Sequence, residues 1–96
     1  MATIDEDAIK AALVKLPDWS REGDVLVRVV KRKDWREAIA LVDAVALEAD
    51  RRDHHPDLSV TGYRTVTFRL TSHDAGGITH RDIDMARAID ELTADG

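Results

Sequence analysis

The histidines of this chain are concentrated in one region. Three of the four lie within twenty residues: His54 and His55, directly before Pro56, and His73. Histidine is the side chain that most readily accepts and donates a proton near neutral pH. The cluster therefore indicates acid/base catalysis, a metal site or a pH-sensitive switch.

The places of these histidines among the predicted elements favour a ligand site. His54 and His55 follow a predicted long helix, which Pro56 prevents from continuing. His73 comes at the end of a predicted strand, and side chains at the ends of rigid elements commonly contact ligands. For the adjacent pair taken alone, a cap at the helix C-terminus is the commoner arrangement, because a protonated imidazole interacts favourably with the helix dipole.

A metal site is a weaker interpretation of the same residues. The histidines, with Asp50, Asp53 or Asp74 nearby, could supply zinc with three ligands. The helical HExxH spacing is missing, and adjacent ligands such as His54 and His55 fit one tetrahedral ion poorly. The chain has no cysteine, which excludes thiolate nucleophiles and disulfides. From the residues alone a metal site is therefore possible but not favoured, and nucleophilic catalysis is less favoured still.

Composition narrows the class of protein. The 96 residues are expected to form one domain, spanning residues 1–96. With 19 acidic and 14 basic residues the net charge is −5, the reverse of the balance typical of nucleic-acid-binding proteins, so we expect no direct nucleic-acid binding. No N-terminal targeting segment is evident, and no apolar run approaches the ~20 residues that span a bilayer. We expect a cytoplasmic protein with no membrane association.

The pattern of apolar residues predicts seven elements in the order αββαββα. Residues 25–31 and 63–72 alternate as strands do, and the residues before each predicted helix include typical capping pairs. The fold class is therefore α+β, with a four-stranded, mainly antiparallel sheet and the helices packed on one face. The predicted helices are 3–15, with Thr3 as its cap, 34–52 and 79–92, and the predicted strands are 19–22, 25–31, 58–60 and 63–72.

The long predicted helix also carries a second apolar stripe. Ala40, Ala44 and Leu47 lie opposite the stripe that faces the core. Small residues let two helices approach closely, so this stripe could pack on a partner helix across an oligomer interface. Single exposed alanines are ordinary, which makes this a weaker expectation.

The spacing of the polar residues resembles the signature of the pterin-4a-carbinolamine dehydratases. In this sequence the signature consists of Asp50, His54-His55-Pro56, Tyr63, His73 and Arg81-Asp82. The resemblance extends to Leu16-Pro17-Asp18-Trp19 and to Lys33-Asp34-Trp35, and so covers nearly the whole chain. It implies dehydration of 4a-hydroxytetrahydropterins to quinonoid dihydropterins, in tetrahydropterin recycling, with no metal and no cofactor.

The resemblance also implies roles for individual residues. His54 and His73 would form the acid/base pair, and His55 would chiefly hold the pterin. Asp50 would orient an imidazole, although the family usually has the longer glutamate there. Trp19 would stack on the pterin or, equally well, pack in the core.

The last helix would complete the pocket. Arg81 and Asp82 would lie at its rim or floor, with Asp82 also serving as the capping-box residue of that helix. His80 lies outside the signature and is expected to be exposed.

Two further expectations come from the family. Some relatives are non-catalytic binding or assembly modules, acting as transcriptional partners or assembly chaperones, often with an altered histidine signature. The intact histidines of this chain favour catalysis. The resemblance also implies a homodimer or a homotetramer, formed through sheet edges or through the long helices.

Overall fold

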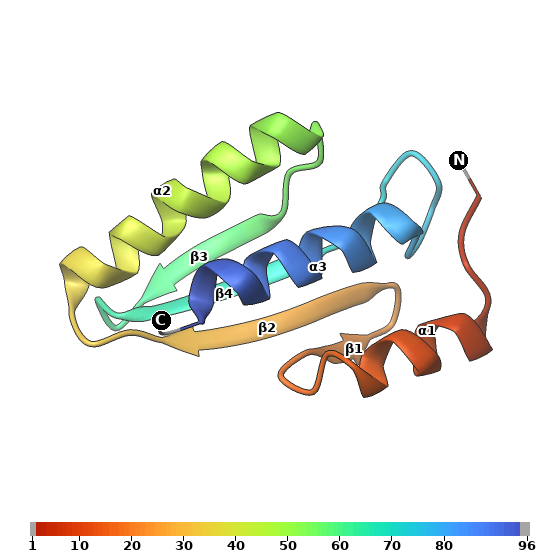
Figure 1. The fold of residues 1–96 in the computed structure, drawn as a ribbon, viewed down its shortest axis with the longest axis horizontal. Coiled ribbons are helices and arrows are strands. Elements are labelled where there is room, and N and C mark those ends of the chain that lie inside the picture. The colour runs from red at the N-terminus through yellow and green to blue at the C-terminus, as the bar shows by residue number, and fades with distance from the viewer. Residues whose placement is uncertain (1, 95–96) are drawn as a thin grey trace.

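The computed structural model describes residues 2–94, and its elements follow one another in the predicted order (Figure 1). The fold is α+β, with an open antiparallel sheet, as expected. The helices of the described part are α1 (Glu6–Val14), α2 (Trp35–Arg52) and α3 (His80–Thr93). The strands are β1 (Ser20–Glu22), β2 (Val25–Lys31), β3 (Asp57–Thr61) and β4 (Thr65–Leu70).

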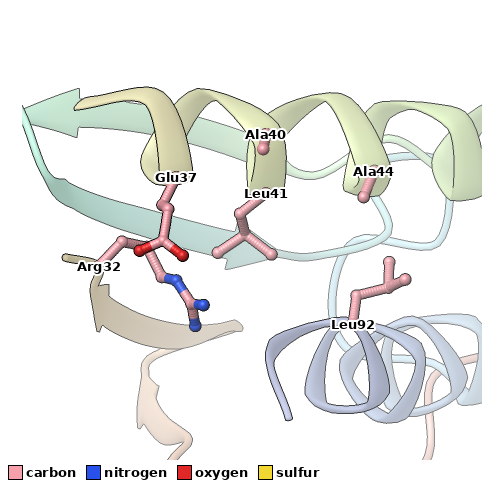
Figure 2. A pocket seen from close by; sticks show the side chains of 6 residues that line it. All are labelled: Arg32, Glu37, Ala40, Leu41, Ala44 and Leu92. Carbon is pink, nitrogen blue, oxygen red and sulfur yellow. The ribbon is translucent and has the colours of Figure 1, made fainter. Parts of the chain in front are cut away.

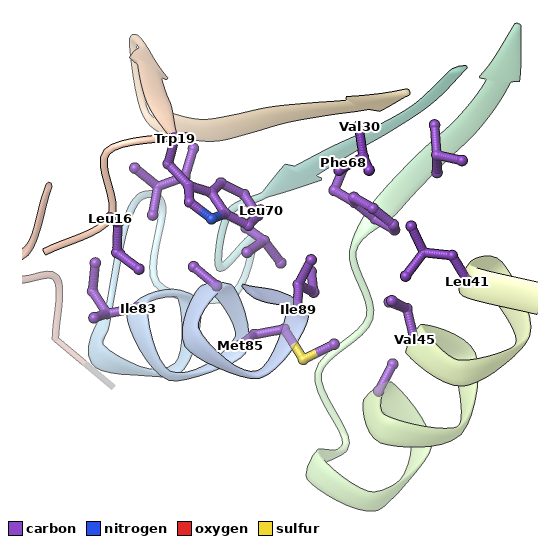
Figure 3. Close-up of a cluster of buried hydrophobic side chains, with 14 of the residues drawn as sticks. Leu16, Trp19, Val30, Leu41, Val45, Phe68, Leu70, Ile83, Met85 and Ile89 are labelled. Atoms are coloured by element: carbon purple, nitrogen blue, oxygen red, sulfur yellow. The ribbon is translucent and has the colours of Figure 1, made fainter. Parts of the chain in front are cut away.

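The sheet has the strand order β1-β2-β4-β3, and every neighbouring pair is antiparallel. The two central strands pair along their length, with Leu26 opposite Leu70 and Val30 opposite Val66. These side chains point to the face that the helices cover, where they join Phe68 in the hydrophobic core (Figure 3). On the opposite face Val29 is 60% exposed. The hydrophobic core fills the face of the sheet that the helices cover. Polar side chains at the ends of the strands and helices remain accessible to a ligand.

Helix α2 carries the first two histidines at its C-terminal end. Its core stripe consists of Ala38, Leu41, Val45 and Ala49, at the spacing of one helical face. Asp53 then adopts a left-handed conformation, with φ of 49°, and the His54 backbone N–H donates to the Ala49 carbonyl at 3.1 Å. This arrangement is the usual way for a helix to end and reverse direction, with an aspartate where glycine is more common. It turns His54 back toward the sheet and α3.

The start of α1 differs from the prediction. Asp5, not Thr3, caps the helix, and its side chain accepts from the Ala8 backbone N–H at 2.8 Å. The reason is a contact distant in sequence, because the Ile4 N–H donates to the Ile78 carbonyl at 3.0 Å and holds the chain extended. Helix formation can begin only after that residue.

The predicted strand 63–72 is also too long at its beginning. Gly62 and Tyr63 both have positive φ values, of 54° and 58°, which are incompatible with a strand. The turn therefore includes Tyr63, and β4 begins at Thr65. Trp19 similarly lies just before β1, which begins at Ser20.

Candidate active site

The three clustered histidines line one cavity. It has a volume of about 420 Å³ and lies where the loop after α2, the loop after β4 and the first turn of α3 meet. The structure therefore brings together residues that are separated by up to 28 positions in the sequence. The lining residues are Asp53, His54, His55, Thr71, Ser72, His73, Asp74 and Arg81.

His54 forms the most buried polar contact of this cavity. Its Nε2 lies 2.6 Å from Oδ1 of Asp82, and the two side chains are 8% and 0% exposed. Asp82 is thus too deeply buried to meet a ligand itself and lies behind His54. The sequence led us to expect Asp82 at the rim or floor of the pocket, and the structure places it behind His54.

The other contacts of Asp82 fix which nitrogen of His54 carries a proton. Oδ2 of Asp82 accepts from the Ser72 hydroxyl and from the Thr79 backbone N–H, both at 2.9 Å. The Thr79 contact is one half of the predicted capping box, which is confirmed. Because the carboxylate already accepts two hydrogen bonds from these groups, we assign the proton of the His54 contact to Nε2. Its Nδ1 is then the nitrogen left to exchange a proton.

His55 is held differently from its neighbour. Its Nε2 lies 2.9 Å from Oδ1 of Asp50, and the two side chains are 60% and 74% exposed. Asp50 therefore reaches an imidazole in spite of its short side chain. An exposed pair of this kind is screened by water and contributes little to stability, so its effect is mainly on ring orientation.

Arg81 connects the two loops that carry the histidines. Its Nη2 donates to the Asp53 carbonyl at 2.5 Å, and its Nη1 lies 3.8 Å from Oδ2 of Asp74. Asp53 directly precedes His54, and Asp74 directly follows His73. The guanidinium therefore holds both histidine-bearing loops from the first turn of α3, at the edge of the cavity.

Trp19 does not line this cavity. The residue is 5% exposed, and Figure 3 shows the indole among the buried hydrophobic side chains next to α3. Its Nε1 donates to Oδ1 of Asp90 at 2.8 Å. A tryptophan in the core with its N–H satisfied has no free ring face for a ligand, so the expected stacking on a pterin is not part of this site.

Ser72 is a functional candidate that the sequence did not reveal. Ser72 continues the alternation of Phe68 and Leu70 and so falls on the buried face, but a serine there matches no motif. The further signals in the sequence were its place beside His73 and its separation of ten residues from Asp82. His80, the fourth histidine, is exposed and does not line the cavity, as expected.

A second hollow lies at the opposite end of α2 and carries none of this chemistry. It has a volume of about 200 Å³ and opens between α2, α3 and the end of β2 (Figure 2). No histidine lines it, so it lacks the acid/base groups that make the histidine cavity the candidate active site. Its lining residues are Arg32, Glu37, Ala40, Leu41, Ala44 and Leu92.

Two features are absent from residues 2–94. No group of three or more histidine, aspartate or glutamate side chains in this range has the arrangement needed to hold a metal ion. None of the helices in the described range is long and apolar enough to cross a membrane.

A family model and the related proteins point to the same family. Residues 2–92 match the family model described as "Pterin 4 alpha carbinolamine dehydratase". A protein of Nocardia farcinica is 53% identical over 89 residues, which are 93% of each chain. A protein of Thermomicrobium roseum is 46% identical over 98% of this chain and all of its own. Both carry the name "Putative pterin-4-alpha-carbinolamine dehydratase".

Two solved structures share the fold. The crystal structure of a "transcriptional coactivator/pterin dehydratase" from Brucella melitensis has a TM-score of 0.90 and 30% identity, covering 96% of this chain and 99% of the other. A pterin dehydratase-like protein identified as a RuBisCO assembly factor in the alpha-carboxysome has a TM-score of 0.65 and 18% identity, over 81% and 89%. The second likeness concerns the fold alone.

Proposed function

Because this chain belongs to the pterin-4a-carbinolamine dehydratase family, we propose that it dehydrates 4a-hydroxytetrahydropterins to quinonoid dihydropterins by histidine acid/base catalysis. The observation that carries the proposal is the cavity lined by all three clustered histidines, one of them held by a buried carboxylate. The reaction needs no redox change and no group transfer, only proton transfers, which imidazoles perform well near neutral pH.

The dehydration breaks one carbon–oxygen bond and moves two protons. The C4a–O bond of the substrate breaks, and the hydroxyl leaves as water after receiving a proton from a general acid. A general base removes the proton on N5, and the electron pair of that N–H bond forms the C4a=N5 double bond. One donor and one acceptor on either side of the C4a–N5 bond therefore suffice.

His54 is suited to the part of the base. Its Nε2–H is committed to Asp82, so the unprotonated Nδ1 is available to receive the N5 proton. The imidazolium that forms keeps its bond to the buried carboxylate, which stabilises the positive charge without any movement of the protein. We assign the removal of the N5 proton to this nitrogen.

His73 and His55 take the remaining parts. His73 is exposed at the cavity, where it can donate a proton to the departing hydroxyl and recover one from water. His55, oriented by Asp50, would bind the pterin ring beside them. Arg81 contacts both histidine-bearing loops and lies at the edge of the cavity.

A second candidate function is a non-catalytic binding or assembly role on the same scaffold. The observation in its favour is the name of the Brucella melitensis protein, which includes "transcriptional coactivator". The complete histidine set of this chain favours dehydration as the primary function. With a net charge of −5, any such role would act through a protein partner and without direct contact to nucleic acid.

The setting of the proposed activity follows from the same observations. We propose that the protein is cytoplasmic. A chain without cysteine forms no disulfide, so it does not require an oxidising compartment. We further propose a homodimer or homotetramer, formed through a sheet edge or through the α2 surface, where Leu47 is 67% exposed.

The direct test is a dehydration assay with purified protein. A 4a-hydroxytetrahydropterin is generated in solution, and the appearance of the quinonoid dihydropterin is followed with and without the protein. The proposal expects a rate well above the spontaneous one. A purified, folded protein with no effect on any such carbinolamine rules the proposal out and leaves the binding or assembly role.

A further inference from the structure

The Ser72 hydroxyl lies at the centre of a buried network behind the proposed active site. The residue is 1% exposed, and its Oγ is 2.8 Å from the Thr79 hydroxyl and 2.9 Å from Oδ2 of Asp82. Thr79 and Asp82 are both 0% exposed. A hydroxyl in such a place is costly unless its proton and its lone pairs are all matched by partners.

The direction of each hydrogen bond in this network follows from the partners. The Asp82 carboxylate only accepts, so the Ser72 proton goes to its Oδ2. The Thr79 hydroxyl accepts from the Arg81 backbone N–H at 3.2 Å and therefore donates its own proton to Ser72. The result is a one-way chain of donors from Thr79 to Ser72 to Asp82, with His54 donating to the other carboxylate oxygen.

We infer that Ser72 is a positioning residue of the proposed dehydratase site, acting on His54 through Asp82. The inference rests on the proposed function, since it assigns Ser72 a part in that reaction. With its Oδ2 held by Ser72, the carboxylate cannot turn, and its Oδ1 stays in line with His54 Nε2–H. The base nitrogen, Nδ1, is thereby kept unprotonated and correctly directed.

Ser72 has a second effect through its place in the chain. It directly precedes His73, so the bond to Asp82 also holds the backbone of the segment that carries the proposed acid. One carboxylate thus fixes His54 through Oδ1 and the neighbour of His73 through Oδ2. The distance between the proposed acid and base depends on both bonds.

The charged groups around His54 stay the same when Ser72 is replaced. A change in the pH dependence of the reaction can therefore be assigned to the lost hydroxyl and not to a lost charge. Those groups are Arg52 at the end of α2, Asp53 and His55 in the next loop, His73 and Asp74 after β4, and Arg81, Asp82 and Asp84 on α3.

The test compares two Ser72 variants with a matched control. Ser72→Ala removes the hydroxyl. Ser72→Cys has nearly the same volume as serine but only a weak hydrogen-bond donor, so it tests the same hydrogen bond if the alanine variant does not fold. The control is Thr93→Val, which removes a buried hydroxyl at the end of α3 that contacts Arg28 and the Asp90 carbonyl outside the cavity. Each protein is assayed for dehydration, and nitrogen-15 NMR of its imidazoles reports the tautomer of His54 without any substrate.

The inference predicts a specific split between the readouts. Both Ser72 variants should lose kcat by about tenfold or more, the usual effect of a hydrogen bond to a charged group. KM should change by less than about twofold, since Ser72 supports the base and not the binding of substrate. The NMR spectrum should change from a single Nε2–H form of His54 to a mixture, and the limb of the kcat pH profile that reports this base should move. Thr93→Val should keep the wild-type kcat and tautomer.

Two outcomes overturn the inference. One is an unchanged kcat and an unchanged His54 tautomer in both Ser72 variants. The other is an equal loss of kcat in Thr93→Val, which would show that the effect is not specific to the hydroxyl that contacts Asp82. Failure of the proposed function looks different, because the wild type itself would then be inactive while the NMR experiment still tests whether Ser72 fixes the His54 tautomer.

Discussion

The Asp82 carboxylate lies 2.6 Å from Nε2 of His54, and the two residues come from different elements, 28 positions apart. A buried carboxylate beside a histidine fixes the tautomer of the ring and stabilises the imidazolium that forms on proton transfer. In the proposed mechanism, this pair leaves His54 Nδ1 as the proton acceptor. The predictions below separate this contact from the other features of the site.

Replacing Asp82 by asparagine should impair both folding and catalysis. An asparagine side chain has one oxygen and one NH₂ group, so it cannot accept from His54, Ser72 and Thr79 together. We expect Asp82→Asn to lower the free energy of unfolding by about 1–3 kcal/mol, the cost of a buried unsatisfied donor. Its kcat should fall more than its KM changes. Urea denaturation and steady-state kinetics measure the two effects, with the exposed Asp84→Asn as a control on the same helix; equal effects of the two variants would contradict the assignment.

The exposed pair of Asp50 and His55 should affect substrate binding more than stability. Since the two side chains are 74% and 60% exposed, Asp50→Asn should change the free energy of unfolding by less than about 1 kcal/mol. We expect KM for the carbinolamine to rise while kcat changes little, because His55 holds the pterin in this account. Asp50→Glu, which keeps a carboxylate at this position, should leave KM near the wild-type value. A loss of kcat at constant KM would instead place His55 among the proton-transferring groups.

Trp19 should contribute to stability and not to substrate binding. Trp19→Phe removes the indole N–H that Asp90 accepts and leaves a space in the core. We expect it to lower the free energy of unfolding by about 1–3 kcal/mol with KM unchanged. Trp35→Phe is the matched control, because Trp35 is 53% exposed and should have little effect. Denaturation followed by far-ultraviolet circular dichroism measures stability. A raised KM in Trp19→Phe would contradict this prediction and indicate that Trp19 contacts the substrate.

One pH effect on stability should arise outside the site, at the end of α2. The side-chain hydrogen bond from Arg52, helped by the charge of Arg51, lowers the pKa of the Glu48 carboxyl below its usual range. A carboxyl with a lowered pKa in the folded protein stabilises the fold above its ordinary pKa. That contribution is lost as the pH falls through the lowered value.

The measurement is the free energy of unfolding as a function of pH. Glu48→Gln should be less stable than the wild type at neutral pH, and the difference should diminish on acidification below about pH 4. Glu91→Gln, at an exposed position of α3, serves as the control. A constant difference at every pH would show that Glu48 acts through packing and not through its charge.

Local chemistry explains why most of the fold could be predicted from the sequence. The alternation of apolar residues gives β2 its observed bounds, Val25–Lys31, and the Asp34 cap gives the observed start of α2. The error at the start of α1 occurred where a distant contact decides the structure. Thr3 is a reasonable cap by sequence, but the bond from the Ile4 N–H to Ile78 keeps the helix from starting there.

The same distinction applies to the site. The spacing of the histidines predicted that His54, His55 and His73 would share a pocket, and the structure places all three at one cavity. Asp50, one helical turn before His54, was expected to orient an imidazole, but the sequence could not show which one. The structure pairs it with His55, while Asp82 from α3 takes His54. The packing of α3 against the end of α2 determines which carboxylate contacts which histidine.

The most direct test of the account measures dehydration of a 4a-hydroxytetrahydropterin by the wild type, His54→Ala, His73→Ala and His80→Ala in parallel. A positioned acid or base commonly contributes about 10²–10⁴-fold, so His54→Ala and His73→Ala should each lose a large part of the rate enhancement. His80→Ala, which removes the exposed histidine outside the cavity, should retain the wild-type rate. The account is contradicted if the two cavity variants remain as active as His80→Ala.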